Sequence, residues 1–223
     1  MPDGQYSFYL HSDDRTDIAA MATISTISQP LRGEFIRTAA TAGAVVYQVD
    51  ARLPALIPVF FAGQLSAVRL CAVMALVSGT WSSLTGLPDE PENGEAALPV
   101  SPETEYQRRR YTLTLQNGRS GERVESVLTE ASSRLRGDLL RNLIITGLAL
   151  HTTAPELPRL LASMPVPPTS VSELQALVQQ MAGTADVNRA AAAVPDMPAA
   201  SAAPVSGSDT REIKKNMRRA FGD

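Results

Sequence analysis

An internal repeat constrains the fold of this chain more than any other feature of its sequence. Residues 31–37 (LRGEFIR) match residues 135–141 (LRGDLLR) at an offset of 104 positions, and the match continues downstream without a gap. Upstream, residues 6–11 correspond to residues 111–116 at an offset of 105, so one residue has been inserted or deleted in between. Self-similarity of this kind indicates two copies of one supersecondary unit, each burying its apolar face against a neighbour.

Each copy is predicted to contain a strand, two helices and a helical cap. Apolar and polar residues alternate in residues 6–11 and again in 111–116, which is typical of a strand with one buried face. The helical regions that follow carry apolar residues three and four positions apart, so that each helix has one apolar stripe. We expect Thr16 to cap the first helix and the second helix to begin near Pro30, because proline suits a first helical turn.

A single short strand needs a partner, because its backbone N–H and C=O groups cannot be left unpaired. The simplest arrangement pairs one strand from each of two copies in an antiparallel ribbon, as in ribbon-helix-helix proteins. Such a ribbon fits the major groove of DNA and presents alternate side chains to the base edges. The ribbon could form within one chain, from residues 6–11 and 111–116, or between two chains that pair like with like. The sequence leaves both arrangements open.

The candidate DNA contacts are the outward-facing strand residues and the basic residues near them. Hydroxyl and amide groups can hydrogen-bond base edges, and arginines that precede the second strand can contact phosphates. The N-termini of the second helices are expected to offer backbone amides to phosphates. An ordinary sheet strand and a solvated run of charge are the alternative interpretations. The candidates are Ser7, Tyr9, His11, Arg32, Arg108, Arg109, Arg110, Thr112, Thr114, Gln116 and Arg136.

Composition divides the chain into five parts, and the expected fold is mainly α with a short β-ribbon. Residues 1–86 and 108–182 are the two ribbon-helix-helix copies with their helical caps. Residues 87–107 read as an acidic, proline-rich linker, and residues 183–208 as a disordered Ala/Pro-rich linker. Residues 209–223 recover a helical pattern. Only the second copy has an evident basic edge, so an asymmetric DNA site is expected.

Few residues in this sequence suit catalysis, so we expect no enzyme, no cofactor and no metal. The histidines are His11 and His151, the one cysteine is Cys71, and no phosphate-binding glycine loop or metal-ligand spacing is present. The most apolar stretch, residues 53–78, is interrupted by Arg69, which favours buried helix over a membrane span. With no signal-peptide pattern at residues 1–11 and no disulfide framework, a bacterial cytoplasmic location is expected.

Residues in and after the second predicted helix resemble the ParR centromere-binding adaptors of actin-type plasmid partition. The resemblance rests on residues 25–32, Arg37, Ala39, Thr41, Ala42, Gly43, Tyr47, Asp50, Arg52 and Pro54, and near the end on Ser208, Asp209, Lys214, Lys215 and Asn216. It implies a ribbon-helix-helix protein that binds repeated centromere sites in double-stranded DNA, self-associates on that DNA and represses its own operon. It also implies that a flexible tail engages the end of an actin-like ParM filament. Because that family is typically a single-copy homodimer, the duplication is a departure from its pattern.

The final segment is predicted to form an amphipathic helix over residues 210–221. Its apolar face would carry Ile213, Met217 and Phe221, with Lys214 beside them. A helix this short is marginal alone in water, so we expect it to order on docking into an apolar groove of a partner. A solubilising terminus is the alternative for this segment. For the whole chain, a ribbon-helix-helix repressor or an antitoxin is the alternative to a segregation adaptor.

Overall fold

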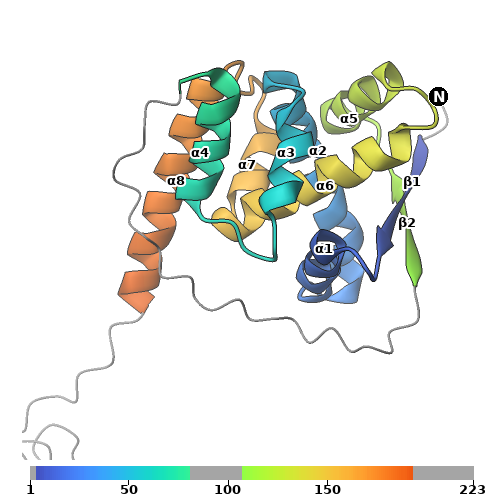
Figure 1. Cartoon of the computed structure of the whole chain (residues 1–223), viewed down its shortest axis with the longest axis horizontal. Helices are drawn as coiled ribbons and strands as arrows, with labels where there is room; N and C mark the ends of the chain where they lie inside the picture. Colours follow the sequence, from blue (N-terminus) through green and yellow to red (C-terminus); the bar gives the residue numbers. More distant parts are fainter. Residues whose placement is uncertain (1–3, 81–106, 193–223) are drawn as a thin grey trace, which may run out of the picture. The chain divides into compact units, whose positions relative to one another are not determined.

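The computed structural model describes residues 4–80 and 107–192, with side chains described as far as residue 183. The fold is mainly helical with a small two-stranded antiparallel sheet. The first half contains β1 (Gln5–His11), α1 (Arg15–Ser25), the 3-10 turn η1 (Gln29–Leu31), α2 (Arg32–Val49), α3 (Leu53–Phe60) and α4 (Ala67–Ser78). The second contains β2 (Arg108–Thr114), α5 (Arg119–Glu130), α6 (Arg136–Thr153), α7 (Leu157–Ser163) and α8 (Val171–Ala192). Each half therefore has one strand followed by four α-helices in the same order (Figure 1).

The two strands pair with each other inside one chain. Their antiparallel register runs from Gln5 opposite Thr114 to His11 opposite Arg108. Phe8, Leu10 and Leu113 are buried on the inward side, which confirms the predicted alternation. Of the two arrangements that the sequence left open, this structure has the ribbon made by a single chain, with α1 and α5 leading away from its opposite ends (Figure 1).

The core helices α2 and α6 cross at two glycines that occupy equivalent positions in the repeat. A Cβ atom on Gly43 would collide with the backbone carbonyl of Leu143, and one on Gly147 would collide with that of Ala39. Glycine is needed at both positions because the two helix backbones touch there. The offset of 104 residues thus corresponds to a pseudo-symmetric crossing of the two core helices.

The cap helices α4 and α8 lie side by side (Figure 1). Cys71 on α4 is buried, and the polar side chains of Gln175 and Gln179 of α8 lie near its thiol. Burial raises the pKa of the Cys71 thiol, so it stays protonated near neutral pH and serves packing. The predicted buried helix in residues 53–78 is present as two helices, α3 and α4, and no helix in the described part of the chain is long and apolar enough to cross a membrane.

Three predicted helix boundaries differ from the structure. The N-cap of α1 is Asp14, whose carboxylate accepts the backbone N–H of Asp17 at 2.9 Å, whereas the Thr16 hydroxyl donates to the carbonyl of Pro58 in α3. The turn η1 precedes α2, so that Pro30 lies in the turn. Helix α8 continues to Ala192, because alanine favours helix, and the linker expected from residue 183 is therefore helical in its first part. The rest of that linker, residues 81–106 and the tail lie outside the described residues.

Candidate nucleic-acid interface

The outward face of the ribbon brings most of the predicted contact residues together. Successive strand residues point to opposite sides, so the face away from Phe8 and Leu10 is fixed by the register. It carries four residues of each strand, namely Gln5, Ser7, Tyr9 and His11 opposite Thr114, Thr112, Arg110 and Arg108. Gln5 was missed in the sequence because the strand was expected to begin at Tyr6, although alternation with Ser7 already places it on this face.

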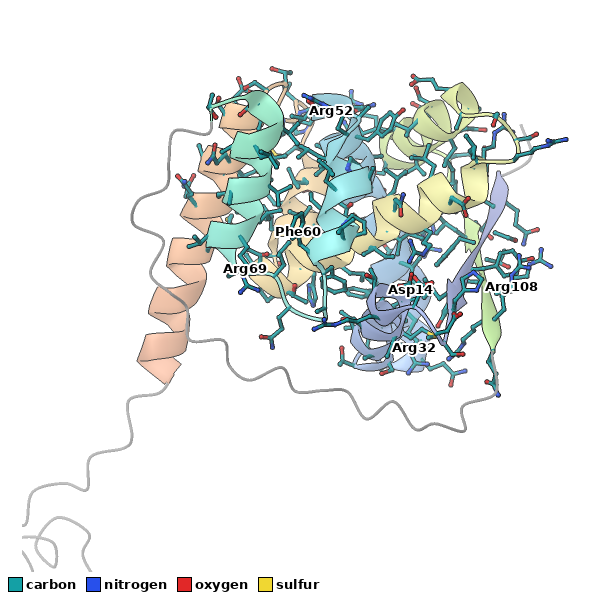
Figure 2. All side chains as sticks on the ribbon, viewed as in Figure 1. Asp14, Arg32, Arg52, Phe60, Arg69 and Arg108 are labelled. Atoms are coloured by element: carbon teal, nitrogen blue, oxygen red, sulfur yellow. The ribbon has the colours of Figure 1, made fainter. Side chains whose placement is uncertain are left out.

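Two arginines of the outward face are held by side chains of the opposite strand. The guanidinium carbon of Arg108 lies 3.4 Å from the centroid of the Tyr9 ring, a cation–π contact. The Arg110 Nε and Nη2 groups donate to the Ser7 hydroxyl at 3.2 Å and 2.9 Å. Arg108 lies at the edge of the molecule formed by the strands (Figure 2). Side chains fixed in this way lose less conformational entropy when they bind a ligand.

The arginine run was predicted to precede the second strand, and this prediction is wrong. Strand β2 begins at Arg108, because its backbone pairs with the end of β1, so the three arginines alternate between faces. Arg109 lies opposite Leu10 and is 5.2 Å from the Tyr111 ring centroid, on the face that carries the core residues. Arg108 and Arg110 therefore share the outward face, and Arg109 does not.

Arg32 and Arg136, at the first positions of α2 and α6, have equivalent roles inside the protein. The Arg32 Nε group donates to the carbonyl of Ile27 at 2.8 Å, and Arg136 Nε donates to that of Ala131 at 3.2 Å. Each arginine thus closes the loop before its own helix. Contact with a phosphate would have to use the guanidinium groups that these bonds leave available.

The first turns of α2 and α6 expose backbone for which the fold gives no packing reason. A Cβ atom on Gly33 would come no closer than 3.9 Å to Arg37, and one on Gly137 would meet the carbonyl of Ser7 at an ordinary 3.5 Å. Packing therefore does not require glycine at either position. Backbone N–H groups at a helix N-terminus attract anions, and the missing side chains leave room for one to approach.

The two ends of the ribbon differ in charge. The end with Tyr9 and His11 carries Arg108 and Arg110, whereas the end with Gln5 and Thr114 has no charged residue on the outward face among the described strand residues. Gln116 lies just beyond β2 and is exposed. The sequence had indicated this inequality only as a basic edge on the second copy.

Sequence reasoning missed an acidic cluster next to the ribbon, in which Asp17 is buried and Asp13, Asp14 and Asp138 are exposed. A shallow cleft of about 450 Å³ is lined by His11, Asp13, Asp14, Asp17, Asp138, Arg141 and Asn142. Burial raises the pKa of Asp17, against the lowering effect of hydrogen bonds from the His11 backbone N–H (2.9 Å) and the Arg141 side chain. Asp17 had no signal in the sequence, because it falls within an apolar helix pattern and its partner lies in the other copy.

His151 has a structural environment at the end of α6. The His151 ring packs edge-on against Phe35 at 4.9 Å between centroids, and its Nδ1 atom lies 3.1 Å from the Pro155 carbonyl oxygen. Within residues 4–80 and 107–192 no group of three or more His, Cys, Asp or Glu residues could hold a metal ion. The predicted partner-binding residues Ile213, Lys214, Met217 and Phe221 lie outside the described residues.

Comparison with models of protein families gives a match to both copies of the repeat. A family model described as plasmid stability protein matches residues 4–74 and 109–178, which together are well over half of the chain. The two matched regions coincide with the two copies and support a tandem duplication. Neither the curated proteins nor the solved structures contain a match to the chain.

Proposed function

The chain belongs to the family of plasmid stability proteins, and from that premise we propose that it maintains plasmids by binding double-stranded DNA through the outward face of the β1–β2 ribbon. In this proposal the two halves are ribbon-helix-helix units fused in one chain, and the ribbon lies in the major groove. The observation that carries it is the pair of arginines, Arg108 and Arg110, fixed on that face by Tyr9 and Ser7. Neither arginine is required to pair the strands, so their fixed orientation on the outward face supports binding of an anionic ligand such as DNA.

The dimensions and chemistry of the ribbon support this proposal. A two-stranded ribbon fits the major groove, where hydroxyl and guanidinium groups can distinguish the base pairs. Ser7 and Thr112, which face each other at the middle of the ribbon, are small enough to let the backbone approach the bases closely. Beside the ribbon, the backbone N–H groups of the first helical turns at Gly33 and Gly137 would bind phosphates of the two DNA strands.

Binding of the full chain to DNA tests the proposal. The probe is a labelled duplex of the DNA upstream of its own gene, with a random-sequence duplex of equal length as a competitor. For the Arg108→Ala/Arg110→Ala double variant, affinity should fall by about tenfold or more, because each arginine contacts a base or phosphate. If both contact phosphates, the slope of log affinity against log salt should also fall by about 2.

A matched control removes a charge elsewhere. Arg69, on α4, is exposed and lies away from the ribbon (Figure 2), so Arg69→Ala should bind DNA like the wild type. Gly33→Ala should weaken binding while the fold is retained, because a methyl group would occupy the place of a phosphate. Unchanged binding by the arginine double variant would show that the ribbon is not the DNA-binding surface.

We also propose that the tail couples the DNA-bound protein to an actin-like ParM filament, as the resemblance to ParR adaptors implies, and that the chain has no catalytic activity. The support is the amphipathic pattern of residues 210–221, in which Ile213, Met217 and Phe221 share one face. Co-sedimentation with the filament protein in the presence of ATP tests this coupling. The Ile213→Ala/Phe221→Ala variant should stay in the supernatant but still bind DNA. Full co-pelleting of that variant would exclude the tail as the filament contact.

A further inference from the structure

The register of the ribbon places two different long side chains at positions related by its internal symmetry. An offset of 105 residues relates Ser7 to Thr112, and these two residues face each other, so the pseudo-two-fold axis passes between them. The same offset relates Gln5 to Arg110, one on each side of that axis. Both residues are exposed and belong to the outward face.

We infer that the ribbon reads a non-palindromic DNA site, with guanine contacted by Arg110 in one half and adenine contacted by Gln5 at the symmetry-related position. This inference rests on the proposed DNA-binding function and adds its base specificity. In a ribbon of two identical strands, the residues on either side of the axis would be the same, and the preferred site would be a palindrome. Here the covalent pairing of two unequal strands removes that requirement.

The chemistry of the two side chains sets the base preference. A guanidinium donates two hydrogen bonds to the O6 and N7 acceptors of guanine, whereas a carboxamide can donate to N7 and accept from N6 of adenine. Arg110 has donors to spare, so it can keep its bonds to the Ser7 hydroxyl while Nη1 and Nη2 reach the base. The bonds to Ser7 restrict the position of the guanidinium to one side of the axis, and hence to one half-site.

Neighbouring residues reinforce the difference between the halves. Arg110 lies opposite Tyr9, which also holds Arg108, so one half of the site meets two cations and an aromatic ring. Gln5 lies opposite Thr114, so the other half meets two uncharged polar side chains. The complex is therefore expected to have a single orientation on its site, with the arginine end on the guanine half.

Selection from a pool of duplexes with a randomised central segment tests this inference, using the full chain and two reciprocal variants. The wild type should enrich guanine at one position and adenine at its symmetry-related position, with each wrong base weakening binding by about 10- to 100-fold. Arg110→Gln should replace the guanine by adenine and so give a palindrome at this pair of positions. Gln5→Arg should do the reverse and give guanine in both halves.

Controls separate this inference from the function on which it rests. Arg69→Gln removes the same charge as Arg110→Gln but lies on α4, and it should enrich the same sequences as the wild type. Unfolding curves that coincide with the wild-type curve show that the ribbon variants are folded. A palindromic wild-type site, or an unchanged guanine in the Arg110→Gln selection, would overturn the base assignment while DNA binding stands. If none of the folded proteins enriches any duplex, the proposed function itself fails.

Discussion

The Arg141 Nε atom lies 2.6 Å from the Asp17 Oδ1 atom, although the two residues are 124 positions apart and belong to different copies of the repeat. Asp17 is fully buried, and its second oxygen accepts the backbone N–H of His11 at the end of β1. The Arg141 Nη2 group also lies 3.3 Å from Asp14. The Arg141 guanidinium on α6 therefore links the start of α1 to the core, and through Asp17 it also holds the end of β1.

The Arg141→Ala substitution should lower the free energy of unfolding by about 3 kcal/mol, because it leaves the buried carboxylate of Asp17 without its charge partner. Urea unfolding followed by circular dichroism measures this loss. The matched control is Arg37→Ala, at the equivalent position of α2, where the partner is the exposed Glu34 one turn away. That pair should contribute less than about 1 kcal/mol. If both variants lost the same free energy of unfolding, the Arg141–Asp17 pair would contribute no more to stability than the exposed Arg37–Glu34 pair.

Substituting the two glycines of α2 should have effects of opposite sign. Gly43→Ala would push a methyl group into the backbone of Leu143 and should cost about 3 kcal/mol, as overpacking does. In Gly33→Ala the new methyl group makes only an ordinary van der Waals contact with Arg37, so the free energy of unfolding should rise by up to about 1 kcal/mol, because alanine favours helix. Thermal and urea unfolding of both variants test this. A tolerated Gly43→Ala would contradict the close crossing of α2 and α6.

The Thr146→Val substitution should stabilise the protein by about 1 kcal/mol. Thr146 is fully buried in α6, and its hydroxyl has no hydrogen-bond partner in the described structure. Burying an unpaired hydroxyl destabilises the folded state, and a methyl group of similar size removes that desolvation penalty. Thr41→Val is the comparison, because the Thr41 hydroxyl donates to the Arg37 carbonyl at 3.0 Å. The Thr41→Val variant should be no more stable than the wild type. A higher melting temperature for Thr41→Val than for Thr146→Val would contradict this prediction.

Protonation of Asp50 should contribute to the loss of stability at acidic pH. Hydrogen bonds from the Arg52 side chain lower the pKa of the Asp50 carboxyl below its ordinary value, and Arg52 also donates to the Val77 carbonyl at 2.8 Å. A carboxyl with a lowered pKa stabilises the fold above its ordinary pKa, and this contribution is lost as the pH falls through the lowered value. The difference in unfolding free energy between the wild type and Asp50→Asn should therefore shrink below about pH 4. A difference that is constant from neutral to acid pH would exclude this contribution.

The sequence was sufficient to predict the features that depend on local pattern. Alternation in residues 6–11 predicted which strand residues are buried, and the repeat offset predicted equivalent core helices, now seen to meet at Gly43 and Gly147. The antiparallel ribbon followed from the need to pair the backbone of Gln5–His11. Pairing within one chain could not be derived, because both arrangements satisfy the same groups.

Features that depend on contacts between distant residues could not be predicted. Three consecutive arginines at 108–110 lack the apolar–polar alternation that indicates a strand, and they join β2 because the end of β1 offers them a backbone partner. The burial of Asp17 has no signal in the sequence, because its partner Arg141 lies 124 positions away in the other copy. The same holds for Arg32, whose bond to the Ile27 carbonyl depends on how the chain folds between two helices.

The pairing of β1 with β2 inside one chain changes how the ribbon responds to dilution. When two separate subunits build such a ribbon, its stability depends on their concentration, and the assembly falls apart as the protein becomes scarce. Here the strands are joined by the chain, so ribbon formation is an intramolecular step whose equilibrium is independent of protein abundance. Under the proposed function, even a small number of molecules would each present a complete ribbon to plasmid DNA.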